Sequence, residues 1–376
     1  MALRSHAVYG CTSKLVPSLI AAAQSIRGLH ALVTGPLDME IPSAPGTEFR
    51  LLCQQSSVEV KAGGSVTVAQ LKATGSWTVL QSISPKGHPV TSVHETPSAA
   101  HTPGAKLTLV VPDKWTSLVI STCGQPVSVA KVNEARLSVH TQGGPVTLGQ
   151  IRAHKALINT LSATAGGGAV QGVEMSAGCV NITSGGAPVT LKRLVGQQVE
   201  VVTGGGAAAV GALYAERCHL HTGGGNLEVG TLDVSIEANV STHGGALSIL
   251  GLDGQAELCS GGGPLETHLH GKVGDVRLST KGGAVQLAVS PQAHVDVCVM
   301  GQGQVECADA DPKTNQQEGT RVFHFKPKPS EETRYGQLSE GHVVVDSQGG
   351  PVQVRLEGWM EALQQRMANK AVQQKA

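Results

Sequence analysis

Doubled or tripled glycines recur along this chain at a nearly constant interval of about 20 residues. We take the residue that follows each glycine group, or its aligned equivalent, as the anchor of one repeat. Successive anchors are 19, 24, 19, 19, 19, 20, 18, 20 and 20 residues apart in the series Pro126, Pro145, Ala169, Pro188, Ala207, Asn226, Ala246, Pro264, Ala284 and Gln304. An early anchor at Ser65 and an outlying one at Pro351 extend the series. This period predicts a repeat architecture whose stacked units share one core.

Apolar residues occupy fixed columns eight and six residues before each anchor, and one and three residues after it. Around Pro145 the columns are Leu137, Val139, Val146 and Leu148. The spacing of two on each side of the glycines predicts half-buried strands. A further apolar column six residues after the anchor breaks this parity, so a bend or bulge must separate the two strands of a repeat.

A hydroxyl recurs four residues before the anchor, where the glycine turn begins. The residues are Thr122, Thr141, Ser184, Thr203, Thr222, Thr242, Ser260 and Thr280. We expect these side chains to stack as a ladder and to form hydrogen bonds with the backbone of the turn, whose glycines supply positive φ angles.

Two strands, a glycine turn and a second bend make one coil, which cannot bury its apolar face alone. Coils stacked about 4.8 Å apart can bury it, each strand pairing with its counterpart one coil away. The sequence therefore predicts an all-β fold, a parallel β-solenoid (β-helix) with coils of about 20 residues.

The predicted boundaries follow from where this pattern begins, loosens and ends. We expect a transit peptide or disordered tail over residues 1–37 and a β-solenoid over 48–356, with loop insertions at 84–105 and 308–341. Residues 357–376 lack Gly and Pro after Gly358, and Trp359, Leu363 and Met367 recur every four residues. This spacing predicts a C-terminal helix that caps the exposed end of the solenoid.

Composition limits the classes of function. Lys plus Arg equals Asp plus Glu at 28 each, so the formal net charge is zero, which argues against broad binding to nucleic acid or to anionic membranes. No apolar run reaches the length of a transmembrane segment. The eight cysteines form no CxxC pair, and their scatter favours a reducing compartment.

The first 37 residues contain no Asp or Glu and carry Arg4, Lys14 and Arg27 among Ser, Ala and Leu. This composition favours a mitochondrial transit peptide. A secretory signal and an unstructured cytosolic tail are the alternatives.

Three features follow one another in the chain: the segment Leu107-Thr-Leu-Val-Val-Pro, the segment Leu118-Val-Ile-Ser-Thr, and the repeated pattern V-x-V-x-T-x-G-G-x-V-x-L. In these features the chain resembles the putative-adhesin β-solenoid domain family over roughly residues 50–356. The chain also resembles the vertebrate member of that family. The resemblance implies a β-solenoid of adhesin type and carries no catalytic residues over. Bacterial members often have Gly-Asp at the turn, whereas Gly-Gly is followed here by Ala, Pro or Asn.

Two groups of polar residues are candidate sites. His219 and His221 share the outward face of one strand, and Glu200 lies in register with His219 one coil earlier, so the three could hold a metal ion. Asp233 and Asp253 stand seven residues after their anchors, so we expect them to stack one coil apart, as an acid–base pair of a β-helix hydrolase or lyase would. Ordinary exposed histidines and turn-satisfying aspartates are the simpler interpretations of both groups.

The leading hypothesis is a non-enzymatic binding or scaffold protein that requires no cofactor and presents an extended surface to a protein or glycan partner. A polymer-acting hydrolase or lyase and a metal-binding module are the alternatives. The glycine runs are not phosphate loops, because no GK[ST] follows them and no helix pattern begins there.

Overall fold

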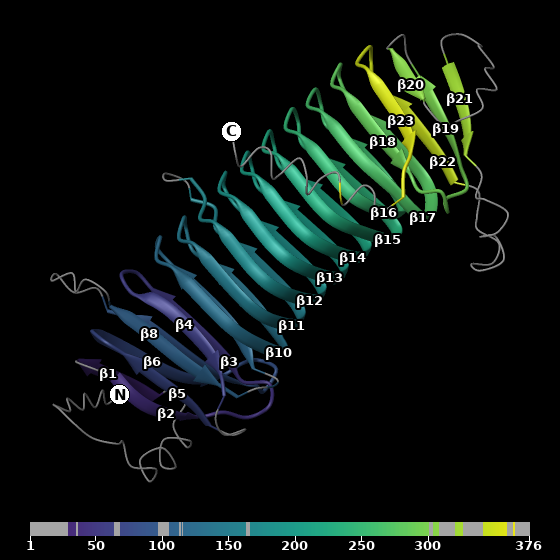
Figure 1. Cartoon of the computed structure of the whole chain (residues 1–376). Helices are drawn as coiled ribbons and strands as arrows, with labels where there is room; N and C mark the ends of the chain where they lie inside the picture. The colour runs from purple at the N-terminus through teal and green to yellow at the C-terminus, as the bar shows by residue number, and fades with distance from the viewer. Residues whose placement is uncertain are drawn as a thin grey trace. The chain divides into compact units, whose positions relative to one another are not determined.

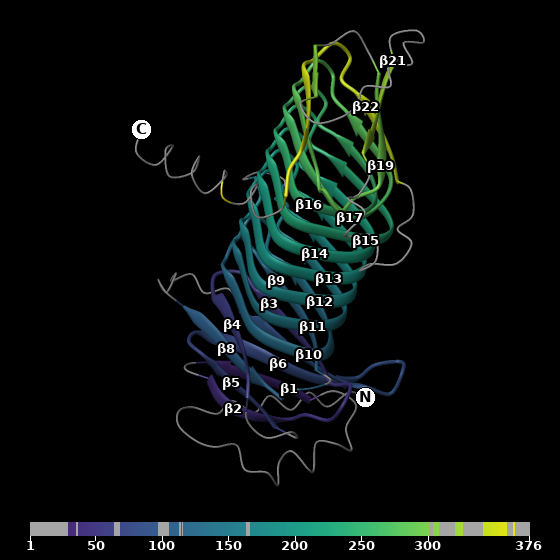
Figure 2. The same cartoon turned by 45° about the vertical axis from the view of Figure 1, so that its right-hand side comes forward.

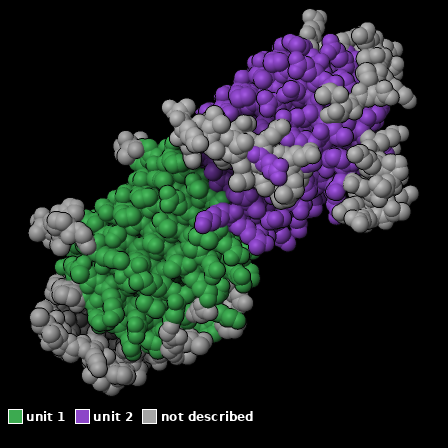
Figure 3. Space-filling model, in the orientation of Figure 1, with its two compact units in different colours: residues 1–191 green, residues 192–376 purple. Residues whose placement is uncertain are grey.

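The computed structural model describes residues 29–34, 37–63, 68–96, 105–112, 114, 116–162, 166–300, 304–307, 320–325, 341–358 and 364. This part of the chain is all-β apart from Gln364, a single residue with helical backbone. It divides into two compact units, residues 1–191 and residues 192–376, which Figure 3 colours separately.

The central strands of each unit are long and run from one glycine turn to the next (Figure 1). Unit 1 contains β10 (Val127–His140), β11 (Val146–Asn159) and β12 (Val170–Thr183), and unit 2 contains β14 (Ala208–His221), β15 (Leu227–Ser241), β16 (Leu247–Cys259) and β17 (Leu265–Ser279). Strand β13 (Val189–Val202) contains the division between the units. Each long strand bends near its middle, so its two halves belong to two sheet layers, and Figure 2 shows β14 to β17 curving in succession.

Burial along these strands confirms the predicted columns. In β14 the buried residues are Ala208, Val210, Leu213, Cys218 and Leu220, which stand one, three and six residues after one anchor and eight and six residues before the next. Neighbouring strands pair in parallel, with Val210 opposite Val229 and Leu220 opposite Val240. The aliphatic columns therefore stack from coil to coil within each unit, as the solenoid prediction requires.

The hydroxyl ladder is also confirmed. Thr141 donates its hydroxyl to the carbonyl of Gly144 at 2.5 Å, and Thr242 donates to Gly245 at 2.6 Å and to Ser260 of the next coil at 3.0 Å. These side chains are fully buried. Because these two hydroxyls donate to backbone carbonyls inside a buried corner, they hold their turns in register and satisfy polar groups that water does not reach.

The three glycines of the turn at Gly223-Gly-Gly are constrained in different ways. Gly223 and Gly224 have φ angles of 62° and 112°, and at the position of Gly223 the next coil has His243 at 54°. Gly225 faces a different limit, because a Cβ there would lie 2.2 Å from the carbonyl oxygen of Gly206. The first position thus tolerates a left-handed side chain. In this coil the second position is glycine for conformation and the third for space, whereas the coil of Ser184 has Ala187 at the third position.

In unit 1 the order of coils in the stack differs from their order in the chain. Strand β3 (Glu48–Cys53) pairs with β9 (Ser117–Thr122) on one side and with β7 (Pro89–Glu95) on the other, all in parallel. Strand β4 (Ser57–Ala62) likewise lies between β10 and β8 (Lys106–Val111). Along the stack, the coil formed by β3 and β4 therefore lies between the coil formed by β9 and β10 and the coil formed by β7 and β8. In the sequence, by contrast, the β7–β8 coil comes between the other two.

Antiparallel strands complete this end of unit 1. Strand β5 (Val68–Ala73) pairs with β8 and with β2 (Leu37–Pro42), and β6 (Ser76–Ile83) pairs with β7 and with β1 (Leu29–Thr34). Glu95, at the end of β7, also links two coils: its carboxylate accepts the backbone N–H groups of Gln54, Gln55 and Ser56 at 2.7, 2.8 and 3.1 Å.

The end of unit 2 shows a second inversion. The late coil formed by β22 (Gly341–Asp346) and β23 (Val352–Leu356) pairs directly with β17 and β18 (Val285–Val289). The earlier coil formed by β19 (Val295–Met300) and β20 (Val305–Cys307) pairs with the other edges of β22 and β23. Residues 341–356 are therefore inserted between two coils that are consecutive in the sequence.

Three predicted boundaries are corrected. Residues 84–105 are not one loop, because Pro89–Glu95 alternates well enough to form β7, with Pro at the first position where its missing N–H is tolerated. Within 308–341, the described Thr320–Phe325 forms β21, antiparallel to β19, and buries Phe323 and Phe325. The tail predicted through residue 37 is too long, because Leu29–Thr34 forms β1; residues 1–28 lie outside the described part.

The helix predicted from Glu357 is wrong at its start. Glu357 and Gly358 have no helical backbone, because the Glu357 N–H donates to the carbonyl of Val289 and prolongs the pairing of β23 with β18. The rest of 357–376, except Gln364, lies outside the described residues. In the described part, the antiparallel strand β21 covers β19 at this end of unit 2, where a capping helix was expected.

Candidate binding groove

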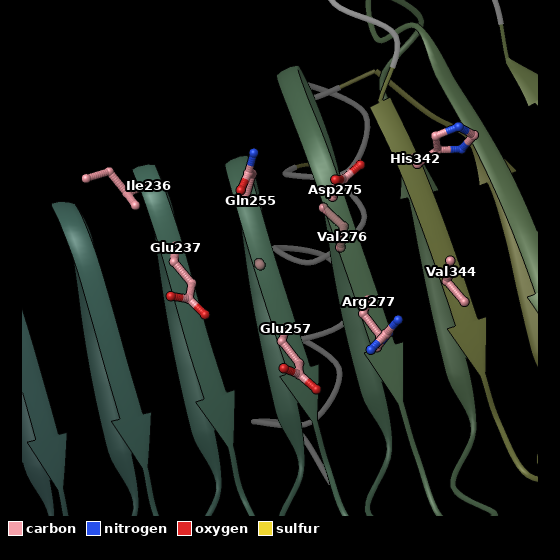
Figure 4. Close-up of a pocket in the computed structure, with 10 residues that line it drawn as sticks. Ile236, Glu237, Gln255, Glu257, Asp275, Val276, Arg277, His342 and Val344 are labelled. Atoms are coloured by element: carbon pink, nitrogen blue, oxygen red, sulfur yellow. The ribbon is translucent and has the colours of Figure 1, made fainter.

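Strands β15, β16, β17 and β22 of unit 2 form a shallow groove of about 500 Å³ on the outward face of one sheet layer (Figure 4). Its lining residues are Ile236, Glu237, Gln255, Ala256, Glu257, Asp275, Val276, Arg277, His342 and Val344. The groove lies over the half of each long strand that follows the bend. Strand alternation turns the charged side chains and Val344 outward there, with Ile236 also exposed, and turns Ala256 and Val276 inward.

Parallel pairing arranges the groove residues in rows that cross the strands. Glu257 pairs with Arg277, which pairs in turn with Val344, and Asp275 pairs with His342. Strands in such a sheet are about 4.8 Å apart, so successive side chains of a row are close neighbours. The groove is therefore built on a regular hydrogen-bonded scaffold rather than on loops.

The groove has an acidic character. Three carboxylates (Glu237, Glu257 and Asp275) and the guanidinium of Arg277 give it a formal charge of −2 with His342 neutral. All four charged side chains are exposed, and Glu237 accepts a hydrogen bond from the Asn239 amide at 3.0 Å. Ile236, which is 41% exposed, adds an apolar patch. This combination suits a partner segment that carries both cationic and apolar side chains.

The predicted metal-binding residues lie outside this groove. His219 and His221 are on β14, where they face Asn239 and Ser241 of β15, and Glu200 is exposed on β13. Within the part of the chain that the structure describes, no three His, Cys, Asp or Glu side chains are placed to hold a metal ion together. Metal binding at these residues stays a prediction from spacing.

His221 takes part in a local polar contact instead. Its Nδ1 atom lies 2.8 Å from the Ser241 hydroxyl, and its ring meets the His243 ring edge-on at a centroid distance of 4.6 Å. Burial lowers the pKa of His221 below its ordinary value, and the nearby His243 and His219 lower it further. The imidazole is therefore neutral over a wider pH range than that of an exposed histidine.

Asp233 and Asp253 pair in register on β15 and β16, which confirms that they stack one coil apart. Asp253 is engaged locally, because its Oδ1 atom accepts the backbone N–H groups of Gly271 and Lys272 at 3.0 and 2.9 Å. Its Oδ2 atom lies 3.7 Å from the Nδ1 atom of His270. The carboxylate thus fixes the bend of the next coil, in agreement with the simpler interpretation of a turn aspartate.

A buried polar cluster beside this bend was not predicted from the sequence. His268 is fully buried on β17, and its Nε2 atom lies 3.1 Å from the carbonyl oxygen of Glu357. The Glu357 side chain is 6% exposed and forms an ion pair with Arg355 at 2.7 Å. The only advance signal was that His268 occupies a position where other coils have Gly149, Gly211 and Gly230.

The cysteines of the described residues are free thiols. Burial raises the pKa of Cys218 to about 12 and also raises that of Cys53, where Glu95 and Cys123 add to the effect. These thiols are therefore weakly reactive members of the core rather than nucleophiles.

The fold and the outward groove define an all-β, solenoid-type protein with a candidate binding face. No protein-family model matches the chain, and no curated protein matches it. Among solved structures, a putative cell adhesion protein from Clostridium sporogenes aligns at 9% identity and a TM-score of 0.19, over 86% of this chain and 100% of that one. A putative adhesin from Bacteroides fragilis aligns at 9% identity and a TM-score of 0.23, over 89% of this chain and 98% of that one. Likeness at this level carries no inference about what the chain binds. No helix of the described residues is long and apolar enough to cross a membrane.

Proposed function

We propose that this chain is a non-enzymatic binding or scaffold protein of the putative-adhesin type, which uses the groove over β15, β16, β17 and β22 to bind a protein or glycan partner. The observation that carries this proposal is the row arrangement of Glu257, Arg277 and Val344 on a rigid sheet face. Charged and apolar groups repeat there at a fixed spacing, which suits recognition of an extended partner.

The acidic character of the groove gives the proposal a direction. A partner segment with Lys or Arg beside apolar residues would complement Glu237, Glu257 and Ile236 better than an acidic or uniformly polar one. Exposed charges are screened by salt, so such binding weakens as ionic strength rises.

A groove-dependent capture experiment tests this function. The full chain and the variant Glu237→Lys with Glu257→Lys are used to capture partners from the same cell fraction. A control variant, Glu228→Lys with Glu266→Lys, makes the same change of charge on the other sheet layer. We expect one partner to be retained by the wild type and the control and lost by the groove variant. Equal retention by all three would refute a role for the groove.

A polymer-acting hydrolase or lyase is the alternative, supported by the register pairing of Asp233 and Asp253. It is less well supported, because Asp253 already accepts two backbone N–H groups. Loss of a polysaccharide-cleaving activity in Asp233→Asn, with the fold intact, would establish it over the binding function.

For localisation, we propose that residues before Leu29 direct the chain to mitochondria, which is supported by their lack of acidic residues and by the start of β1 at Leu29. Fractionation of cells that express the full chain, with N-terminal sequencing of the processed protein, tests this. Recovery of the unprocessed chain in the cytosol would contradict it.

A further inference from the structure

The path of the chain is fixed at Glu357, two residues before the segment 359–376 begins. The Glu357 N–H donates to the carbonyl of Val289 at 3.0 Å, and the carbonyl oxygen of Glu357 lies 3.1 Å from the His268 ring. Both partners lie at the bend of unit 2, and Asp275 of the groove follows His268 on the same strand after that bend. The chain therefore leaves β23 at the bend from which β17 continues into the groove through Asp275.

The sequence after Gly358 complements the groove in charge. The side chains of residues 359–376 carry a formal charge of +2, because this segment contains Arg366, Lys370 and Lys375 and one acidic residue, Glu361. The groove side chains carry −2 by the count given above. Opposite charges on a short tether attract at an effective concentration far above that of a free partner.

The same sequence complements the groove in apolar content. Trp359, Leu363 and Met367 recur every four residues, Arg366 follows Leu363 by three, and Lys370 follows Met367 by three. At helical spacing these positions share one side, which would present apolar and cationic groups together. The groove offers the matching combination in Ile236, Val344 and the carboxylates of Glu237 and Glu257.

Residues 359–376 are long enough to cover the groove. The groove crosses four neighbouring strands, and so spans three strand spacings, or about 14 Å. Residues 359–376 span about 27 Å even as a helix, the most compact regular conformation available to them.

From these observations we infer that the groove is a docking site for the chain's own residues 359–376, with Arg366 and Lys370 directed to Glu237, Glu257 and Asp275. This goes beyond the proposed function: any other partner of the groove must displace the segment. The consequence is a built-in competitor that lowers the apparent affinity for every external partner by the same factor, so that a partner needs a high intrinsic affinity to occupy the groove.

Hydrogen exchange of the full chain, followed by mass spectrometry, tests the inference without any partner. We expect amides of residues 359–376 to exchange at least tenfold more slowly than in an unstructured peptide of that sequence. The groove variant Glu237→Gln, Glu257→Gln, Asp275→Asn should lose this protection, and the control Glu228→Gln, Glu266→Gln on the other sheet layer should keep it. Amides of β15 to β17 report whether each variant is folded.

A charge exchange adds a rescue. Arg366→Glu with Lys370→Glu should abolish protection, and adding Glu237→Lys with Glu257→Lys should restore it. The inference is overturned if the wild-type segment is unprotected, if protection ignores the groove variants, or if protection disappears on dilution, which would mean that a second copy supplies the segment. None of these outcomes depends on the proposed external partner, so the two proposals fail separately.

Discussion

Thr280 donates its side-chain hydroxyl to the backbone carbonyl of Ser347 at 3.3 Å, although the two residues are 67 positions apart in the chain. The contact belongs to the same ladder in which Thr242 donates to Ser260 of the following coil. Residues 341–356 therefore occupy the stack position directly after β17 and β18. The coil that follows β18 in the sequence, β19 with β20, is displaced one step further along.

The ladder should contribute measurably to stability. Thr141→Val keeps the shape of a fully buried side chain but leaves the Gly144 carbonyl without its 2.5 Å partner. We expect a loss of about 1–3 kcal/mol in the free energy of unfolding, measured by denaturant titration. Thr147→Val, the same change at an exposed position of the same coil, should alter it by less than about 0.5 kcal/mol. Equal effects at the two positions would show that the ladder hydroxyls do not matter.

The close approach of neighbouring turns makes Gly225 intolerant of any side chain. A Cβ at this position would lie 2.2 Å from the Gly206 carbonyl oxygen, and both atoms belong to backbone that cannot move aside independently. Gly225→Ala should therefore cost about 3 kcal/mol or more in the free energy of unfolding. Gly271→Ala is the matched control, because nothing lies within 4 Å of its added Cβ. A tolerated Gly225→Ala would mean that the coils are farther apart than described.

His221 should titrate below the ordinary histidine value of about 6.5. Its folded-state pKa is lowered by burial and then by His243 and His219, so the unfolded chain binds more protons as the pH falls. This residue's contribution to stability is therefore complete above pH about 6.5 and is lost as the pH falls through the folded-state pKa.

An NMR titration of the His221 ring measures this shift directly. His243→Gln should raise the His221 pKa only in part, because burial is the larger cause and remains. A midpoint at or above that of a model peptide would contradict the described packing of His221 against His243.

The repeat carried most of the fold information in the sequence. Columns such as Leu220 and Val240 are visible because burial on a stacked strand enforces an aliphatic residue at every coil. The ladder is visible for the same reason, because a dry corner accepts only a side chain that can satisfy the turn carbonyls.

The order of the coils could not be read from the period alone. The interval from Ala284 to Gln304 is 20 residues, which fits direct stacking as well as any other interval. One overlooked signal opposed it: four residues before Gln304 stands Met300, whereas Ser347 stands four before Pro351. Ser347 continues the column of hydroxyl residues to which Thr280 belongs, and its backbone carbonyl accepts the Thr280 hydroxyl.

The groove was equally hidden from sequence reasoning. Glu257 and Arg277 both stand seven residues before their anchors, so the repeat implied their stacking, but nothing in the pattern marked these outward residues as part of a groove. Asp275 and His342 are brought together only by the inserted coil, so no spacing in the chain could have indicated their contact. The predicted pair Asp233 and Asp253 was placed correctly because both belong to consecutive regular coils.

Cysteine cross-linking across the end of unit 2 tests the stacked, inserted arrangement most directly. Gln286 and Gln353 are register partners, and Gln353 is in turn the partner of Glu306. We predict that Gln286→Cys with Gln353→Cys oxidises to a disulfide in the folded chain, identified by mass spectrometry. Gln286→Cys with Glu306→Cys, two strand spacings apart at about 9.6 Å, should not. A disulfide in the second pair and none in the first would show that coils stack in chain order and would contradict the account.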